Sequence, residues 1–208
     1  MPELNQLFVF FAASALLALS PGPDNLFVMA QSVQNGRIAG LLVTLGLSTG
    51  LVVHTLAVAF GLAALVAASS LAFTLLKFAG AAYLLYLAWK AFRSGASVCS
   101  AVGEGPADRW RLYRRGIVMN ISNPKVSIFF LAFLPQFADP SRGPVVPQLL
   151  VLGLLFMVAT MLVFGTLSML AGGAGARLRQ SEPARKIIDR IAGAIFGALA
   201  LKLLLAER

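Results

Sequence analysis

The amino-acid sequence predicts an all-α, polytopic membrane protein with six transmembrane helices arranged as two inverted three-helix repeats. Three observations predict this fold class. Of the 208 side chains, 59% are hydrophobic and only 12% are charged, which is far from the balance of a soluble domain. Six apolar segments are each long enough to cross a hydrocarbon core of about 30 Å. Motifs of the first half of the chain also return, in the same order, in the second half.

The six apolar segments are the predicted membrane helices. They lie at 4–30, 38–66, 70–92, 115–137, 147–171 and 187–206. The first segment is preceded by an acid and by no basic residue, so we expect a retained helix and not a signal peptide. The prediction is a single transmembrane domain over 1–208, with repeat 1 at 1–95, a cytoplasmic loop at 96–112 and repeat 2 at 113–208.

Basic residues predict the orientation of these helices. Lys and Arg gather between the third and fourth helices and between the fifth and sixth, whereas the opposite side offers only Arg142, near Asp139, and charges near the termini. Because positively charged loops stay in the cytoplasm, both termini are expected on the outer side. The net charge of +9 is explained by this topology, so we expect contact with the lipid bilayer and no nucleic-acid partner.

The internal repeat consists of three pairs of motifs. They pair KFAGAAYLLYLAWK at 77–90 with RIAGAIFGALALKL at 190–203, LGL at 45–47 with LGL at 152–154, and SPGPDN at 20–25 with SNPKVS at 122–127. A unit with an odd number of helices places its second copy upside down in the membrane. Inverted repeats with broken helices are typical of secondary transporters, which bind their substrate where the repeats meet.

Prolines are predicted to break the first and fourth helices. Ser20 followed by Pro21 has the pattern of an N-cap and a first helical residue, and so has Asn123 followed by Pro124. In lipid, a freed backbone group is costly unless it faces protein or a water-filled cavity. Two matching breaks therefore predict a polar cavity lined by both, with helix N-termini whose free amides suit a carboxylate.

Two charged residues, Asp24 and Lys125, follow the predicted breaks. Ionisable groups inside a membrane are functional candidates because their burial is costly, so we expect both to face one cavity. A zwitterionic amino acid would place its ammonium near Asp24 and its carboxylate near Lys125. One acid balanced by one lysine favours a neutral amino acid over a dibasic one. The alternative is a structural ion pair that joins the two halves.

Four motifs together resemble a known family. They are SPGPDNLFV in the first predicted helix, GLSTGLVVH in the second, LLKFAGAAYLLYLAWKAFRSG in the third and NISNPKVSIFFLAFLPQF in the fourth. In this order and spacing, over nearly the whole chain, they resemble the LysE/RhtB superfamily of bacterial amino-acid exporters. The resemblance implies export of amino acids or related metabolites across the inner membrane, driven by proton antiport, and allows a homodimer.

The resemblance also implies roles in the transport pathway or its gating for residues of these motifs. They are Pro21, Gly22, Pro23, Gly46, Gly50, His54, Lys77, Gly80, Tyr83, Asn123, Pro124 and Lys125, to which Asp24 and Asn25 are added from the first motif. For His54, a buried neutral imidazole and a proton relay both stay open. Gly46 and Gly50 also fit close helix packing, and Lys77 also fits an interfacial position.

Other classes of function fit the sequence less well. No Gly-rich phosphate-binding motif is present, so transport must draw on an ion gradient or on a partner subunit. One His and one Cys offer few nucleophile and base pairs for a membrane-embedded enzyme, and we expect no catalytic residues. They also supply too few ligands for a metal-ion exporter, so neither a metal nor a cofactor is expected. An exporter of another small solute is the remaining alternative.

Overall fold

The computed structural model of the chain describes residues 2–20, 22–62 and 108–170. It also describes the single positions 74, 78, 81–82, 85–86, 88–89, 93, 187, 190, 194, 197–198 and 200–201. Within the continuous ranges every regular element is a helix, as the sequence predicts. The third and sixth predicted helices lie outside these ranges, and so do the candidate site residues Pro21, Lys77, Gly80 and Tyr83.

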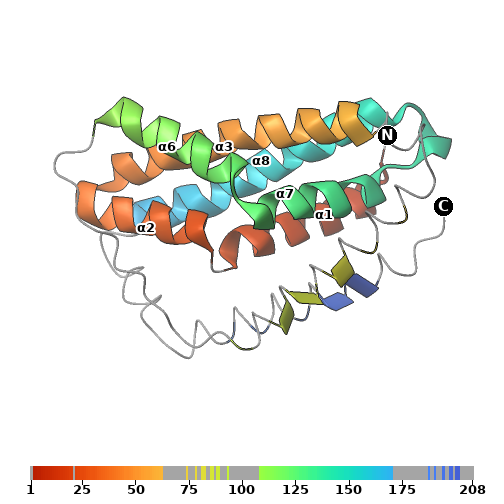
Figure 1. Cartoon of the computed structure of the whole chain (residues 1–208), viewed down its shortest axis with the longest axis horizontal. Helices are drawn as coiled ribbons and strands as arrows, with labels where there is room; N and C mark the ends of the chain where they lie inside the picture. Colours follow the sequence, from red (N-terminus) through yellow and green to blue (C-terminus); the bar gives the residue numbers. More distant parts are fainter. Residues whose placement is uncertain are drawn as a thin grey trace.

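The continuous ranges contain six α-helices and three shorter helical elements. They are α1 (Leu4–Leu19), α2 (Pro23–Asn35), α3 (Arg37–Leu56), the π-helix η1 (Ala57–Leu62), α6 (Arg109–Ile121), α7 (Pro124–Ala132), the 3₁₀-helices η2 (Leu134–Phe137) and η3 (Pro140–Arg142), and α8 (Val145–Leu170). Figure 1 shows α1 and α2 running in the direction opposite to α6 and α7, and α3 running opposite to α8.

Several of these helices are suited to a lipid bilayer. Arg37–Gly61 and Val145–Leu170 are each long and apolar enough to cross a membrane. Two bent pairs, α1 with α2 and α6 with α7, add one candidate span each if each pair is counted as one. The described part of the chain therefore holds two to four candidate spans, as expected of a multi-pass membrane protein.

The predicted break in the fourth helix is confirmed in detail. Asn123 is the N-cap of α7, and its side-chain Oδ1 accepts a hydrogen bond of 3.0 Å from the backbone N–H of Lys125. Pro124 occupies the first helical position, where its missing N–H leaves no hydrogen bond unmade. The chain bends by 52° between α6 and the helical stretch Pro124–Phe137.

The first helix breaks as well, but its predicted cap is wrong. Ser20 is the C-cap of α1, because its N–H closes the last turn on the carbonyl of Leu16 at 2.8 Å. The N-cap of α2 is Gly22, whose backbone is extended, and Pro23 is the first helical residue. The second proline of the motif therefore begins the new helix, and α1 and α2 lie at 61° to one another.

Helix boundaries differ from the prediction at three further places. Helix α6 begins at Arg109, inside the loop predicted at 96–112. It begins there because the side chain of Asp108 caps it, accepting a hydrogen bond of 3.1 Å from the backbone N–H of Trp110. α2 ends at Gly36, whose φ of 84° suits glycine. After α3 the chain continues as the π-helix η1, a change of pitch that hydropathy does not predict.

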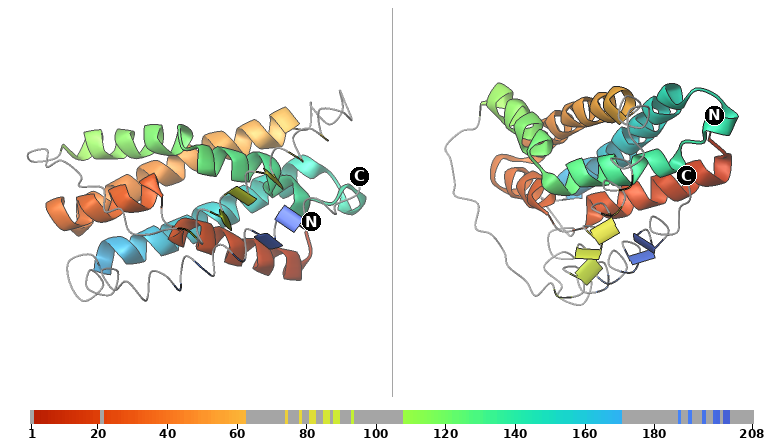
Figure 2. Two further views of the ribbon diagram at one scale, coloured as in Figure 1. Left: turned by 60° about the horizontal axis from the view of Figure 1, so that its bottom comes forward. Right: turned by 45° about the vertical axis from the view of Figure 1, so that its right-hand side comes forward.

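Phenylalanine rings hold α1, α7 and α8 together. Phe10 packs edge-to-face against Phe137 at 5.2 Å between ring centroids, and Phe129 lies 4.5 Å from Phe133. Phe156 of α8 contacts Phe130 at 5.0 Å. All six rings are buried, and Figure 2 shows α1 alongside α8. This aromatic cluster fixes the second half-helix, α7, against the first, α1.

Small residues bring α3 and α6 into close contact. A Cβ atom built on Gly46 would lie 2.1 Å from the backbone carbonyl oxygen of Tyr113, and one built on Gly116 would lie 2.5 Å from the carbonyl of Val43. A Cβ atom on Gly50 would likewise lie 2.7 Å from the Cβ of Asn120. These distances leave no room for a side chain, so the backbones of α3 and α6 touch.

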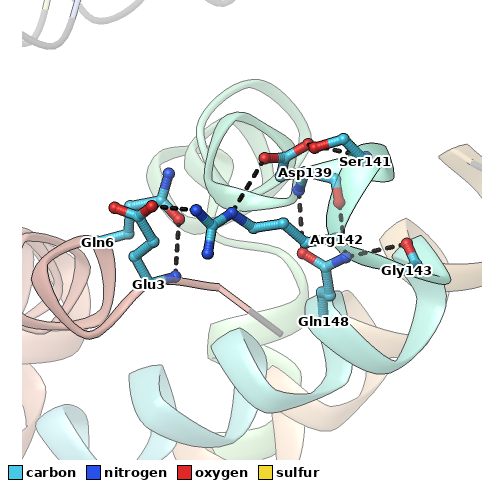
Figure 3. A network of polar contacts seen from close by, with 7 residues as sticks. All are labelled: Glu3, Gln6, Asp139, Ser141, Arg142, Gly143 and Gln148. Carbon is cyan, nitrogen blue, oxygen red and sulfur yellow. Dashed lines mark hydrogen bonds and ion pairs between the residues drawn. The ribbon is translucent and has the colours of Figure 1, made fainter.

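Polar contacts join the beginning of α1 to the turn that precedes α8 (Figure 3). The guanidinium of Arg142 contacts the carboxylates of both Glu3 and Asp139. The Gln148 side chain accepts from the N–H of Asp139 at 2.9 Å and donates to the carbonyls of Asp139 and Gly143. Figure 1 places this end of the bundle opposite the end where α3 and α6 begin with arginines.

Candidate functional site

A cavity of about 30 Å³ lies where the two helix breaks meet. Its polar lining consists of Ser20, Gly22, Asp24, Asn25, Asn120, Asn123, Lys125 and Thr160. Its apolar lining consists of Leu17, Ala18, Leu51, Val126, Phe156 and Phe164. These residues come from both bent pairs and from α3 and α8, so the cavity depends on the whole described bundle. Its volume admits a few water molecules and no amino acid.

Lys125 connects the two breaks. Its side-chain Nζ donates hydrogen bonds to the backbone carbonyls of Leu17 at 2.8 Å and of Ser20 at 2.9 Å. The last carbonyls of a helix have no partner within the helix and carry a partial negative charge, which a lysine ammonium satisfies. The first turn of α7 is therefore bound to the last turn of α1.

Asn25 completes this arrangement from α2. Its side-chain Nδ2 donates to the carbonyl of Ala18 at 2.9 Å and to that of Leu19 at 3.3 Å. Together with Lys125, it provides partners for four consecutive carbonyls at the end of α1. Because an unsatisfied carbonyl in lipid costs several kcal/mol, these two side chains make the break tolerable inside a membrane.

Three residues of the cavity lining each carry one oxygen atom that has no hydrogen-bond partner among the residues that the structure describes. These atoms are Oδ1 of Asp24, Oδ1 of Asn120 and Oγ1 of Thr160. All three side chains are buried, with 6%, 2% and 3% of their surface exposed. The cavity thus combines the Lys125 ammonium, already bound to backbone carbonyls, with a group of oxygen atoms that are free to accept.

The other described candidates lie around the cavity without lining it. Pro23 and Pro124 stand at the first positions of α2 and α7, where they shape the breaks. Gly46 and Gly50 lie in the contact between α3 and α6. His54 sits at the end of α3, just before η1, with its Nε2 3.2 Å from the carbonyl oxygen of Asn120.

Sequence reasoning missed two polar residues of the cavity, Asn120 and Thr160. Asn120 lies three residues before the cap Asn123, which places both near one face of the chain at the break. Thr160 lies in the middle of the apolar helix α8, where threonine is unremarkable because its hydroxyl can bond the carbonyl four residues earlier. The proximity of Asn120 to the cap was a usable signal, and Thr160 offered none.

Comparison with known proteins gives one family and several relatives. A family model described as LysE type translocator matches residues 15–207. The chain is 34% identical over 189 residues to a homoserine/homoserine lactone efflux protein of Salmonella typhimurium strain LT2, covering 91% of both chains. It is 33% identical to the protein of the same name from Salmonella typhi, again over 91% of both. An uncharacterized membrane protein of Vibrio cholerae is 29% identical over 99% of both chains. No solved structure matches the chain.

Proposed function

The chain belongs to the family of LysE type translocators, and we propose that it exports a neutral amino acid or a close derivative across the bacterial inner membrane in exchange for protons. The observation that carries this proposal is the cavity between the two breaks, which Asp24 and Lys125 both line. Support comes from the names of two relatives, homoserine/homoserine lactone efflux proteins. Homoserine is a neutral zwitterion, and a cavity with one acid, Asp24, and one lysine, Lys125, favours a solute of this kind.

The proposed architecture is the one that the sequence predicts, a single domain of two inverted three-helix repeats with both termini outside. It is supported by the opposite directions of the two bent pairs and of α3 and α8 (Figure 1). It is also supported by the proline at the first position of both α2 and α7. In this proposal Lys77, Gly80 and Tyr83 of the third predicted helix complete the pathway, and two copies of the chain form a dimer.

The proposed roles follow from the charges at the cavity. Asp24 binds the ammonium of the amino acid, and Lys125, with the first amides of α7, binds its carboxylate. Gly22, Asn25 and Asn123 line the route between them, and Pro21, Pro23 and Pro124 hold the breaks. Gly46 and Gly50 fix α3 against α6, and His54 is the candidate proton relay.

Binding requires a change from the conformation described here. The cavity of about 30 Å³ is too small for an amino acid, and the carbonyls of Leu17 and Ser20 occupy the Lys125 ammonium. The end of α1 and the start of α7 must therefore separate before a carboxylate reaches Lys125. A substrate carboxylate then replaces the two carbonyls as the partner of the ammonium, so binding and opening are coupled.

Export from cells tests the proposal. A host without its own exporters is loaded with dipeptides, and extracellular amino acids are measured for the wild type, Asp24→Asn and Lys125→Met, with the membrane abundance of each protein. Asp139→Asn, which removes a partly exposed carboxylate that does not line the cavity, is the matched control. Imposing or collapsing the pH gradient tests the exchange with protons.

We expect the wild type and Asp139→Asn to accelerate release of one or a few amino acids, and the two cavity variants to lose this release at normal abundance. If no amino acid leaves faster than from the empty host, the exporter proposal is wrong. If both cavity variants export normally, the protein exports amino acids but the charged site is misplaced.

A further inference from the structure

The three oxygen atoms without partners, at Asp24, Asn120 and Thr160, form a group with a common chemical character. Of the five buried side-chain atoms without a partner in the described part of the chain, three belong to residues that line this one cavity, and the one on Asn120 also lies close to Gly50 of α3. The Asp24 and Asn120 atoms can only accept hydrogen bonds, and the Thr160 hydroxyl accepts as well as donates. A buried polar atom without a partner is costly, so the group is incomplete without a donor.

Thr160 is the most informative of the three. Most buried hydroxyls on the described helices bond the carbonyl four residues earlier, as is usual in apolar helices; besides Thr160, the exception is Ser48 of α3, which does not line the cavity. These bonds are Ser14 to Phe10, Ser32 to Val28, Thr44 to Gly40, Thr55 to Leu51 and Ser168 to Phe164, at 2.6 to 2.9 Å. The hydroxyl of Thr160, in the same helix as Ser168, makes no such bond and lines the cavity instead.

Water fits the cavity and can donate to these atoms, so a solute group that replaces it has to offer several N–H or O–H donors and match a nearby negative charge. A primary ammonium has three N–H donors and one positive charge, which fits one carboxylate, one amide oxygen and one hydroxyl. Hard metal ions such as Ca²⁺ take six or more oxygen ligands, more than this group provides. The same cavity shows this chemistry in use, since the backbone carbonyls of Leu17 and Ser20 hold the ammonium of Lys125.

We propose that Asp24, Asn120 and Thr160 together bind the primary ammonium group of the exported solute, and that they select for unsubstituted amines. This inference rests on the proposed function for the nature of the solute and adds Asn120 and Thr160 as specificity residues. Replacing the N–H hydrogens by methyl groups keeps the positive charge but removes every donor. An N-trimethylated amino acid therefore keeps the attraction to Asp24 and loses its ammonium hydrogen bonds to the three side chains.

Binding and transport are measured separately on the purified full-length chain. Calorimetry in lipid nanodiscs compares homoserine, alanine and leucine with their N-trimethyl forms, and counterflow into proteoliposomes measures transport of the same compounds. The variants are Thr160→Val, which removes the hydroxyl at nearly constant volume, and Thr160→Ser, which retains it. Thr44→Val is the matched control, since the Thr44 hydroxyl is buried but bonds Gly40 away from the cavity.

For at least one amino acid we expect the N-trimethyl form to bind the wild type about tenfold more weakly or worse, the loss typical of hydrogen bonds to a charged group. Thr160→Val should weaken binding of the parent amino acid and so reduce the ratio of the affinities for the parent and the N-trimethyl form. Thr160→Ser and Thr44→Val should leave this affinity ratio unchanged. Three results would overturn the proposed ammonium site: equal affinity of the wild type for the two forms, an unchanged affinity ratio in Thr160→Val, or no binding of any of the six compounds. If the protein binds the parent amino acids more tightly than their N-trimethyl forms but shows no counterflow, the ammonium site is supported and the exporter proposal is refuted.

Discussion

The close contact between α3 and α6 makes Gly46→Ala a sharp test of the structure. The new Cβ atom would lie 2.1 Å from the carbonyl oxygen of Tyr113, more than 1 Å inside the ordinary contact distance of 3.4 Å. The obstacle is backbone, so no rotamer change relieves it and the two helices must move apart. Overpacking of this kind costs about 1–3 kcal/mol, and a cost near 2 kcal/mol lowers the melting temperature of a chain of this size by roughly 4–8 °C.

Two further glycines calibrate the measurement. In Gly165→Ala the nearest atom to the new Cβ is a methyl carbon of Leu41 at 4.0 Å, so no clash arises and the stronger helix propensity of alanine stabilises α8. In Gly153→Ala the Cβ would lie 2.2 Å from Cγ2, 2.4 Å from Oγ1 and 2.9 Å from Cβ of Thr55, so no rotamer of this β-branched side chain relieves the clash and we expect a loss here too.

The assay is thermal unfolding in detergent, followed by size-exclusion chromatography of the protein that remains folded. We expect the melting temperature of Gly165→Ala to be at or above that of the wild type, and those of Gly153→Ala and Gly46→Ala to be below it. A melting temperature of Gly46→Ala equal to that of Gly165→Ala would refute the tight contact between α3 and α6.

Two more predictions concern local polar groups. Asn123→Ala removes the cap from the N–H of Lys125 and should lower stability by about 1 kcal/mol, which thermal unfolding measures, while Asn123→Ser, which keeps a capping oxygen and adds no charge, should retain most of the stability. The hydroxyl and backbone N–H of Ser141 hold the pKa of Asp139 below its ordinary value, so this carboxylate stabilises the fold above about pH 4 and the effect is lost as the pH falls through its lowered pKa. Ser141→Ala should raise this pKa and flatten the acid dependence of stability; carboxyl NMR of Asp139 checks it, and an unchanged titration contradicts the assignment.

The part of this fold that depends on local chemistry could be predicted from the sequence. The cap and first helical residue at Asn123 and Pro124 follow from rules that act within a few residues, and the structure confirms them. The same rules misplaced the first break, because SPGP offers two prolines and both Ser20 and Gly22 can begin a helix. Which one does so depends on the end of α1, whose last turn already uses the N–H of Ser20.

The part that depends on distant contacts could not be predicted. Nothing in the local sequence indicates that Lys125 bonds the carbonyls of Leu17 and Ser20, more than 100 residues earlier. Thr160 looks like any threonine of an apolar helix until its missing backbone hydrogen bond is seen in place. The π-helical pitch of η1 could not be predicted either, because a hydropathy profile depends on which residues are apolar and not on the number of residues per helical turn.

The pairing of the last carbonyls of α1 has a consequence for the electrical insulation of the membrane. Lys125 and Asn25 bond four consecutive carbonyls that would otherwise attract a file of water molecules into the break. If export is driven by proton exchange, as we propose, such a file of water would conduct protons and discharge the gradient that drives it. Under this proposal, Lys125 and Asn25 limit proton leak through the break in the conformation described here.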